Sequence, residues 1–294
     1  MRVYLRIILT LLVAVGMILA KQMGVTDISI EDFFPPEPVE MPEESSFSIE
    51  FLDVGEGDAA MIHCDGHHML IDGGSSEYSS FIYTKLKDEG INHLDLIVAT
   101  HPDADHVGGL SGALNYAKVD TALSTGETKD TRSFSNFVKY LEKQGKAITV
   151  PDVGDKYELG SAEITVLGPQ KGETYSDNTS LVLRILYGNT SFLFTGDSEY
   201  YDEQYLLSTG AKLKSTVLKV GHHGSRWSSS EDFIRKVRPD YAVISVGKDN
   251  AYGHPKEEVL NRLLNYGAVI YRTDLNGSIR CTSDGNEVSF ELEK

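Results

Sequence analysis

A continuous apolar segment, residues 94–100, runs directly into the sequence His101-Pro102-Asp103-Ala104-Asp105-His106. A run of this length is typical of a strand that is buried on both faces of a sheet. In α/β proteins, functional side chains gather where such strands end. Two histidines and two aspartates in six residues exceed what a helix cap needs, because a cap requires one acceptor. Since imidazole and carboxylate groups bind first-row divalent metals, this segment predicts a metal site at a sheet edge.

Strand and helix patterns alternate from Phe47 to the C-terminus. Apolar and β-branched runs predict strands over 47–53, 59–64, 68–72, 94–100, 162–167, 179–187, 191–195, 215–220, 240–246, 268–272, 277–282 and 287–291. Helical spacing predicts helices over 77–89, 107–117, 133–144, 199–208, 230–237 and 255–266. Many short strands with helices between them imply an α/β fold of two sheets with helical outer layers, formed by one domain over residues 47–294.

The N-terminal segment has a different character. Residues 1–21 contain an apolar run, three basic residues and no acid. The apolar run, Ile7–Ala20, is shorter than the ~20 residues that a spanning helix needs. The segment therefore predicts either a signal peptide or an uncleaved N-terminal membrane anchor, and hence an exported protein. Residues 22–46 are acidic and proline-rich, and we expect a solvated linker there.

Composition excludes several classes of protein. The formal net charge is −17, and residues 22–84 contain 14 acids and no Lys or Arg. Such a chain has no general electrostatic footprint for nucleic acid, although bound metal ions can still attract a phosphate locally. Two cysteines, Cys64 and Cys281, are too few for a disulfide scaffold. The sequence leaves open whether these two pair or remain buried thiols.

Three further polar motifs adjoin predicted strands. Gly196-Asp197 follows strand 191–195, and Gly221-His222-His223-Gly224-Ser225 follows strand 215–220. Asp177-Asn178 precedes strand 179–187. Each motif is weak by itself, since a Gly-Asp pair is usually a turn. Their recurrence beside strands makes a shared site the better interpretation.

Four motifs, in their order along the chain, resemble those of the metallo-β-lactamase fold superfamily: IDGG, HPDADHVGGL, TGD and GHHGS. Within this superfamily, the chain is similar to the extracellular hydrolase domain of ComEC-type DNA-uptake competence proteins. The segments that carry this similarity are FLDVGEGDAAMI, DNTSLVLRI, LKVGHHGS and AYGHP. The resemblance covers residues 47–294. It implies a four-layer αββα sandwich that holds two divalent metal ions at the sheet edge.

The resemblance also implies a set of ligands. The first ion would be held by His101, Asp103 and Asn178. The second would be held by Asp105, His106 and His222, with His223 as the alternative to His222. Asp197 would bridge both ions. The usual motif is HxHxDH, so Asp103 replaces a histidine, and Asn178 lies where most members have another histidine. Oxygen ligands shift the expected metal from zinc toward manganese or magnesium.

Several other residues are expected to support this site. Asp53 and Asp72 end strands and could orient ligand histidines, whereas Asp58 is expected to close a turn. Ser225 is a candidate to bind a phosphate oxygen, and His254 is a candidate to donate a proton. Trp227 could stack on a base, with packing as the alternative.

These features predict an exported hydrolase that uses two Mn²⁺ or Zn²⁺ ions and a metal-bound hydroxide, with Asp105 essential. The resemblance favours a phosphodiesterase or nuclease acting on DNA, with single-stranded DNA as a candidate substrate. A metallohydrolase of a small ester, lactone or phosphodiester such as a choline phosphate is one alternative. The other is a catalytically degenerate binding domain on a tether, with contact to the membrane only through the N-terminal segment.

Overall fold

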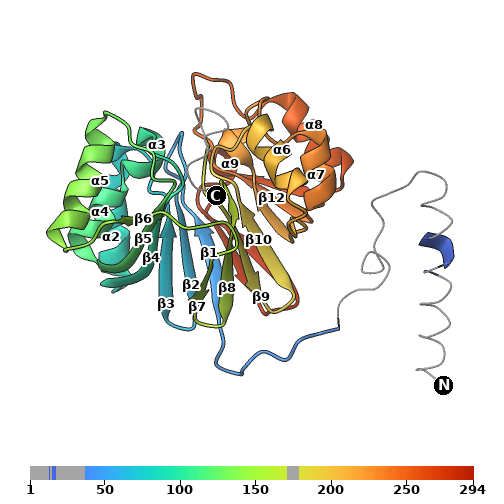
Figure 1. The fold of residues 1–294 in the computed structure, drawn as a ribbon, viewed down its shortest axis with the longest axis horizontal. Helices are drawn as coiled ribbons and strands as arrows, with labels where there is room; N and C mark the ends of the chain where they lie inside the picture. Colours follow the sequence, from blue (N-terminus) through green and yellow to red (C-terminus); the bar gives the residue numbers. More distant parts are fainter. Residues whose placement is uncertain (1–12, 14, 18–36, 171–178) are drawn as a thin grey trace. The chain divides into compact units, whose positions relative to one another are not determined.

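The computed structural model describes residue 13 and residues 15–17, 37–170 and 179–294 (Figure 1). The chain divides into two units, residues 1–40 and Met41–Lys294, and the elements below belong to the second. Most of the predicted signal peptide or anchor, and much of the predicted linker, lie outside the described residues. Within the described part of the chain, no helix is both long and apolar enough to cross a membrane.

Two mixed sheets form the centre of the second unit. The first has eight strands in the order β15 (Val288–Leu292), β14 (Ile279–Ser283), β1 (Phe47–Phe51), β2 (Ala60–Cys64), β3 (His67–Ile71), β4 (His93–Ala99), β5 (Lys118–Ser124) and β6 (Ile148–Thr149). The second has seven strands in the order β13 (Val269–Arg272), β12 (Tyr241–Ile244), β11 (Val217–Lys219), β10 (Thr190–Phe194), β9 (Val182–Tyr187), β8 (Ala162–Gly168) and β7 (Lys156–Leu159).

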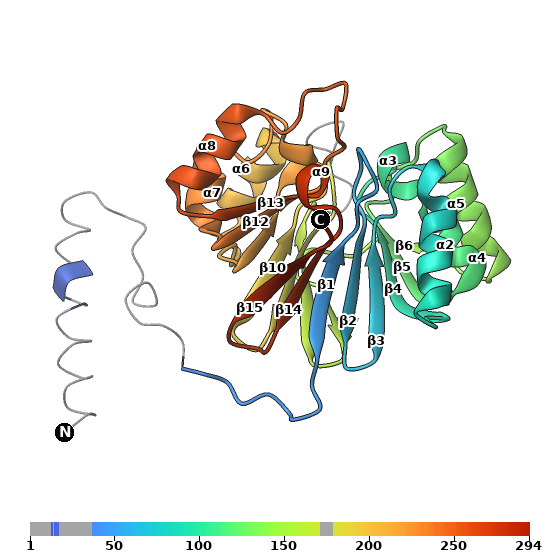
Figure 2. The ribbon, with the colours of Figure 1, turned by 180° about the vertical axis from the view of Figure 1, so that it is seen from behind.

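Helices cover the outer face of each sheet, as Figures 1 and 2 show from opposite sides. The first sheet carries α2 (Ser79–Asp88), α3 (Ala104–Val107), α4 (Leu110–Tyr116) and α5 (Arg132–Lys143). The second carries α6 (Tyr200–Ser208), α7 (Glu231–Val237) and α8 (Glu257–Asn265), while short α9 (Thr273–Asn276) follows β13. The layers run helix, sheet, sheet, helix, so the predicted αββα sandwich is confirmed.

Three apolar clusters hold these layers together. The largest lies between the sheets, where the Phe47 ring stacks at 4.9 Å on both Tyr187 and Phe192 of the opposite sheet. The other two lie under the helices of each sheet. In α5, for example, Thr131 caps the first turn by accepting from the N–H of Phe134, and helical spacing buries Phe134, Phe137 and Leu141.

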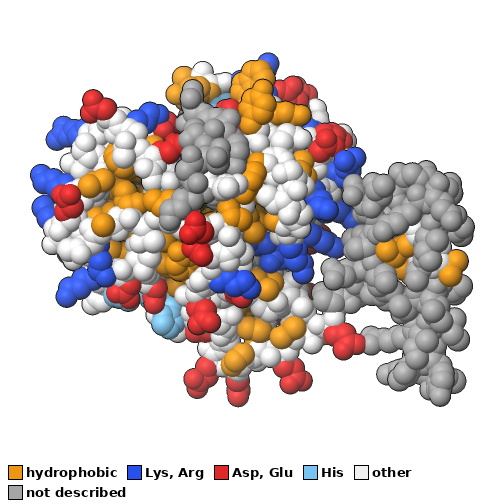
Figure 3. Space-filling view, viewed as in Figure 1, with side chains coloured by type: hydrophobic (Ala, Val, Ile, Leu, Met, Phe, Trp, Pro, Cys, Tyr) orange, Lys and Arg blue, Asp and Glu red, His pale blue; other side chains and the backbone are white. Residues whose placement is uncertain are grey.

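Strand direction brings distant loops to one edge. β4 is parallel to β3 and β5, and β10, β11 and β12 are parallel to one another. The carboxyl ends of β3 and β4 therefore share an edge of the first sheet, as those of β10 and β11 share an edge of the second. On the face shown in Figure 3, acidic and basic side chains are interspersed.

The predicted helices and strands recur with small shifts. The sequence patterns did not reveal β5, β6, β7, α9 or the short α3, of which only Val107 falls within the helix predicted over 107–117. The alternation breaks down within β5, since Lys118 and Asp120 are exposed while Ala122, Leu123 and Ser124 are all buried. Its pairing with β4 supplies what its own pattern lacks.

Candidate metal centre

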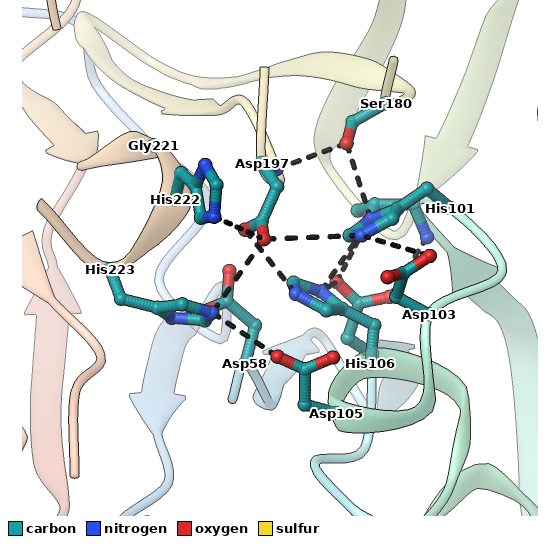
Figure 4. A network of polar contacts seen from close by, with 12 residues as sticks. Asp58, His101, Asp103, Asp105, His106, Ser180, Asp197, Gly221, His222 and His223 are labelled. Carbon is teal, nitrogen blue, oxygen red and sulfur yellow. Dashed lines mark hydrogen bonds and ion pairs between the residues drawn. The ribbon is translucent and has the colours of Figure 1, made fainter. Parts of the chain in front are cut away.

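Four side chains from three loops converge at this edge of the fold (Figure 4). Asp105, His106, Asp197 and His223 each present one ligand atom, and these atoms lie within 4.8 Å of one another. Asp105 and His106 follow β4, Asp197 follows β10, and His223 follows β11. Three of the four residues are buried, and the Asp105 side chain is 37% exposed. The geometry thus joins segments more than a hundred residues apart into one His/Asp cluster.

Asp72 fixes the orientation of His106. Its Oδ2 accepts from Nδ1 of His106 at 2.9 Å and from the Thr100 hydroxyl at 2.7 Å, and its Oδ1 accepts from the Thr100 N–H at 2.8 Å. With Nδ1 donating to Asp72, Nε2 of His106 is directed at Asp197, whose Oδ1 lies 3.3 Å away. A carboxylate behind a histidine is how proteins hold an imidazole for metal binding, so Asp72 lies where the sequence expects it.

His223 is held in the same way from the other sheet. Its Nδ1 donates to the carbonyl of Ser245 at 3.0 Å and lies 3.3 Å from Oδ1 of Asp58. Its Nε2 then faces Asp105 at 3.5 Å and Asp197 at 3.7 Å. His222 and His223 both have left-handed backbone conformations, with φ of 48° and 52°. The left-handed region of backbone conformation costs energy for residues other than glycine. The surrounding structure must therefore hold the tight turn after β11 in place.

Asp58 is part of this network rather than a simple turn residue. Its Oδ2 lies 2.7 Å from Nζ of Lys219, and both side chains are buried. Burial raises the pKa of Asp58, but Lys219 and His223 outweigh burial and lower it to about 2. Asp58 therefore stays ionised beside the His223 ring. The sequence pattern gave one clue, since Lys219 is a charged residue within an otherwise apolar strand.

His101 and Asp103 lie on the other side of Asp197. Nε2 of His101 is 3.9 Å from Oδ1 of Asp103 and 3.9 Å from Oδ2 of Asp197. Burial and the neighbouring His106 lower the pKa of His101, which favours the neutral imidazole that metal binding requires. Both carboxylate oxygens of Asp103 contact Nζ of Lys129 at 2.5 Å. A cation thus already faces Asp103, and the sequence did not reveal this partner.

The cluster fits divalent metal ions. Four buried atoms that face its centre have no hydrogen-bond partner among the described residues: Nε2 of His101, His106 and His223, and Oδ1 of Asp197. Unsatisfied buried polar atoms are costly, and an ion at the centre would satisfy them together.

Electrostatics agree with that fit. Burial lowers the pKa of His106 and His223, but the surrounding carboxylates, Asp197 foremost, outweigh it. The pKa of His223 rises to about 10, and that of His106 rises well above its usual value. The site therefore stabilises positive charge strongly, and divalent cations can supply that charge.

His222 and His223 have the opposite positions from those that the sequence favoured. The sequence favoured His222 beside Asp105 and His106, with His223 as the alternative, but His223 occupies that place. Nε2 of His222 instead lies 3.8 Å from Oδ2 of Asp197, and its Nδ1 is 3.2 Å from Glu199. His222 thus lies beside Asp197 on the side away from the Asp105 carboxylate. Two consecutive left-handed residues turn the rings in directions that no strand periodicity predicts.

Three other expected supporting residues have different outcomes. The structure does not bring Asp53 to a histidine of the cluster, because its carboxylate pairs with Lys294 at 3.0 Å. Ser225 is buried, and its N–H donates to the carbonyl of His222 at 2.7 Å, so this N–H is not available for a phosphate. His254 lies beside the cluster, with its ring 5.8 Å from that of His222 and its Nδ1 3.3 Å from Glu56.

One expected ligand cannot be placed. Asn178 lies outside the described residues. Two residues further on, the hydroxyl of Ser180 lies 3.3 Å from Nδ1 of His101 and accepts from the N–H of Asp197 at 3.0 Å. Ser180 therefore joins the two sides of the cluster, a role that the sequence did not indicate.

Comparison with known proteins agrees with this fold and cluster. Residues 52–248 match the family model of the metallo-beta-lactamase superfamily. The chain belongs to this superfamily, whose members are generally metal-dependent hydrolases that typically bind two divalent ions. The resemblance inferred from the sequence motifs is thereby confirmed.

Among curated proteins, the chain is 29% identical to Competence protein ComA of Neisseria gonorrhoeae over 280 residues, which are 93% of this chain and 38% of that protein. It is 32% identical to ComE operon protein 3 of Bacillus subtilis over 259 residues, which are 80% of this chain and 33% of that protein. It is 34% identical to Recombination protein 2 of Haemophilus influenzae over 242 residues, which are 80% of this chain and 29% of that protein. The chain thus spans about a third of the length of these relatives.

Solved structures share the fold. The metallo-beta-lactamase fold protein YhfI of Bacillus subtilis has a TM-score of 0.51 and 14% identity, and the match covers 82% of this chain and 99% of YhfI. An E377D mutant of the CmlA beta-hydroxylase has a TM-score of 0.52 and 16% identity, over 90% of this chain and 58% of CmlA. At these identities the likeness concerns the fold alone.

Proposed function

We propose that this protein is an exported phosphodiesterase that hydrolyses DNA with two divalent metal ions, Mn²⁺ or Zn²⁺. The observation that carries the proposal is the position of Asp197. Its Oδ1 faces Nε2 of His106 at 3.3 Å, and its Oδ2 lies between His101, His222 and His223 at 3.7–3.9 Å. A carboxylate with histidines on both sides is suited to bridge two ions.

The remaining residues divide between two ligand sets. His101, Asp103 and His222 would hold one ion beside Asp197, and Asp105, His106 and His223 would hold the other. When bound, the ions would activate water and stabilise negative charge on the phosphate. Asp72 and Asp58 would keep the imidazoles in position. His254, whose side chain is 8% exposed and whose ring lies 5.8 Å from that of His222, would be the candidate to donate a proton to the leaving oxygen.

The choice of DNA as substrate draws on the relatives. Their names associate them with competence and recombination, but the chain covers only about a third of each. Export draws on the basic and apolar N-terminal segment. Because the sequence motifs resemble the extracellular hydrolase domain of DNA-uptake competence proteins, we extend an action on DNA outside the membrane to this chain.

A hydrolase of a small ester, lactone or phosphodiester is the second candidate. The net charge of −17 favours it, because a polyanion is repelled at long range by an acidic protein. The two candidates share the metal centre and differ in the size and chemistry of the substrate. A degenerate binding domain is the third, and it conflicts with the convergence of His and Asp side chains around Asp197.

The deciding experiment compares three substrates with the full-length protein. Single-stranded DNA, bis-p-nitrophenyl phosphate and a lactone are each incubated with Mn²⁺ and with Zn²⁺. We expect hydrolysis of DNA and of the phosphodiester, and none of the lactone. Asp105→Ala is expected to abolish turnover while circular dichroism remains that of the wild type. Cleavage of the lactone alone would overturn the assignment.

A further inference from the structure

Exposed aromatic side chains gather near the metal centre. Among the described residues, the exposed aromatic side chains are Phe81, Tyr200, Tyr201, Trp227 and Tyr252. All except Phe81 belong to segments that also carry the cluster. Trp227 closely follows His223, the two tyrosines of α6 closely follow Asp197, and Tyr252 lies in the loop of His254. Single exposed apolar residues need no explanation, but their concentration at one edge indicates a binding surface.

Tyr252 begins a series of rings that leads from the surface to the metal centre. Its side chain is 68% exposed and stacks on the His254 ring, with centroids 5.6 Å apart and planes at 18°. The His254 ring lies in turn 5.8 Å from that of His222 and 6.4 Å from that of His223. A planar group that stacks on the free face of Tyr252 would therefore be separated from the His222 ring by the rings of Tyr252 and His254.

Trp227 lies on the loop that follows His222 and His223. It is 65% exposed, yet its backbone is fixed, because its carbonyl accepts from the N–H of Tyr200 at 2.8 Å. The hydroxyl of Ser228 donates to the carbonyl of Gly221 at 2.7 Å and closes the loop that contains His222. A large exposed indole on a fixed loop can bind a flat ligand with little loss of conformational entropy.

Each of these two aromatic residues has a basic neighbour. Arg226 precedes Trp227, and its side chain is 55% exposed and 3.5 Å from Glu258. Lys256 donates from Nζ to the carbonyl of Tyr252 at 2.6 Å. Figure 3 shows hydrophobic side chains together with a basic one at the upper edge of this face, over the loop between β12 and α8. Aromatic rings with a basic side chain beside each match a ligand that alternates bases with phosphates.

We propose that Trp227 and Tyr252 form a stacking platform that holds the bases of a single-stranded nucleic acid at the metal centre. The inference rests on the proposed phosphodiesterase function and specifies its substrate as single-stranded. Stacking tolerates any base and needs no broad basic face, which agrees with a net charge of −17. The bases of a duplex are paired and stacked already, so a duplex would not use the platform.

The chain offers a direct probe, because Trp227 is its single tryptophan. Intrinsic fluorescence of the full-length protein is titrated with a phosphorothioate oligothymidylate of about 12 nucleotides, a size in the range of single-strand binding sites. An abasic phosphorothioate of the same length and a duplex are the comparisons. We expect saturable quenching by the oligothymidylate and little by the other two. Equal quenching by the abasic strand or the duplex, or none by any ligand, would overturn the platform.

Substitutions test the two rings separately. Trp227→Ala and Tyr252→Ala are each expected to weaken binding of a fluorescently labelled oligothymidylate by about 5- to 100-fold, the usual effect of losing one stacked base. Trp227→Phe should recover part of the affinity. The matched control is Phe81→Ala, an exposed aromatic that lines a separate surface pocket with Arg280 and Leu292, and its affinity should equal that of the wild type. Wild-type affinity of both alanine variants would contradict the proposal.

The same assays separate this inference from the proposed function. Suppose that the protein hydrolyses single-stranded DNA, but that oligothymidylate does not quench Trp227 and both alanine variants bind it with wild-type affinity. The platform is then wrong and the phosphodiesterase assignment stands. If oligothymidylate quenches Trp227 but no phosphodiester is hydrolysed with Mn²⁺ or Zn²⁺, the platform stands and the enzyme assignment is wrong.

Discussion

Nζ of Lys219 lies 2.7 Å from Oδ2 of Asp58, and the other carboxylate oxygen of Asp58 lies 3.3 Å from Nδ1 of His223. Lys219 is 3% exposed and Asp58 5%. A buried lysine is thereby linked through one carboxylate to a histidine of the metal centre. The pairing crosses the sandwich, since Asp58 precedes β2 of the first sheet and Lys219 ends β11 of the second.

Breaking this ion pair should destabilise the protein. In Lys219→Met the buried carboxylate of Asp58 loses its lysine and keeps only His223 as a charged neighbour, and we expect the free energy of unfolding to fall by about 3–5 kcal/mol. Urea denaturation followed by circular dichroism measures this loss. The double variant Lys219→Met/Asp58→Asn removes the unpaired charge and should recover much of the stability. A double variant no more stable than Lys219→Met would contradict the account.

Asp72 should control metal affinity. In Asp72→Asn the acceptor of the His106 N–H is weakened, and we expect affinity for Zn²⁺ or Mn²⁺ to fall by about 10- to 100-fold, as is usual when the partner of a ligand histidine is lost. Isothermal titration calorimetry of the metal-stripped protein measures the change. Asp53→Asn is the matched control, because Asp53 also follows a strand but pairs with Lys294. If the two variants lose equal affinity, Asp72 has no special role.

Much of this site could be predicted from sequence because local patterns encode it. The apolar strand before His101 and the polar residues at strand ends fixed the edge at which ligands meet. The partners of those ligands could not be predicted. Asp58 and Lys219 are distant in the chain, and only the packing of the two sheets pairs them. Likewise Lys129 reaches Asp103 from a loop whose sequence gives no sign of a contact.

The two cysteines illustrate the same limit. The sequence left their pairing open, whereas the structure places both as buried free thiols. Cys64 on β2 and Cys281 on β14 flank β1, where they pair with Phe47 and Ile49. Two strand spacings and a two-residue offset along the strands separate them by roughly 12 Å, beyond the reach of a disulfide.

Both thiols should therefore be unreactive in the folded protein. Burial raises the pKa of Cys64, to about 11, and that of Cys281, to about 12, so neither forms the reactive thiolate at neutral pH. With Ellman's reagent we expect no rapid reaction in buffer and two thiols per chain in denaturant. A thiol count of zero in denaturant under non-reducing conditions would indicate a disulfide and contradict this arrangement.

Glu203 should make stability depend on pH. It is buried in α6 and accepts from the N–H groups of Ser229 and Ser230. Burial raises the pKa of Glu203 from 4.5 to about 7, although those hydrogen bonds lower it. Because the folded pKa is the higher one, this group contributes full stability below about pH 4.5, and that contribution is lost as pH rises through about 7.

The matched variant for that effect is Glu203→Gln, which cannot ionise. Between about pH 5 and pH 8, the wild type should lose roughly 2–3 kcal/mol of unfolding free energy relative to the variant. Urea denaturation of both proteins across this range gives the difference. A difference that stays constant with pH would show that Glu203 titrates normally.

The central claim is that Asp197 joins two cation sites, and metal content tests it most directly. Full-length protein is stripped with a chelator, loaded with Mn²⁺ or Zn²⁺, desalted and analysed by inductively coupled plasma mass spectrometry. We expect about two ions per chain in the wild type, as is usual for paired-metal hydrolase sites, and a clear loss of bound metal in Asp197→Ala, with circular dichroism unchanged. A wild-type protein that retains no metal, or an Asp197→Ala variant that retains as much as the wild type, would contradict the account.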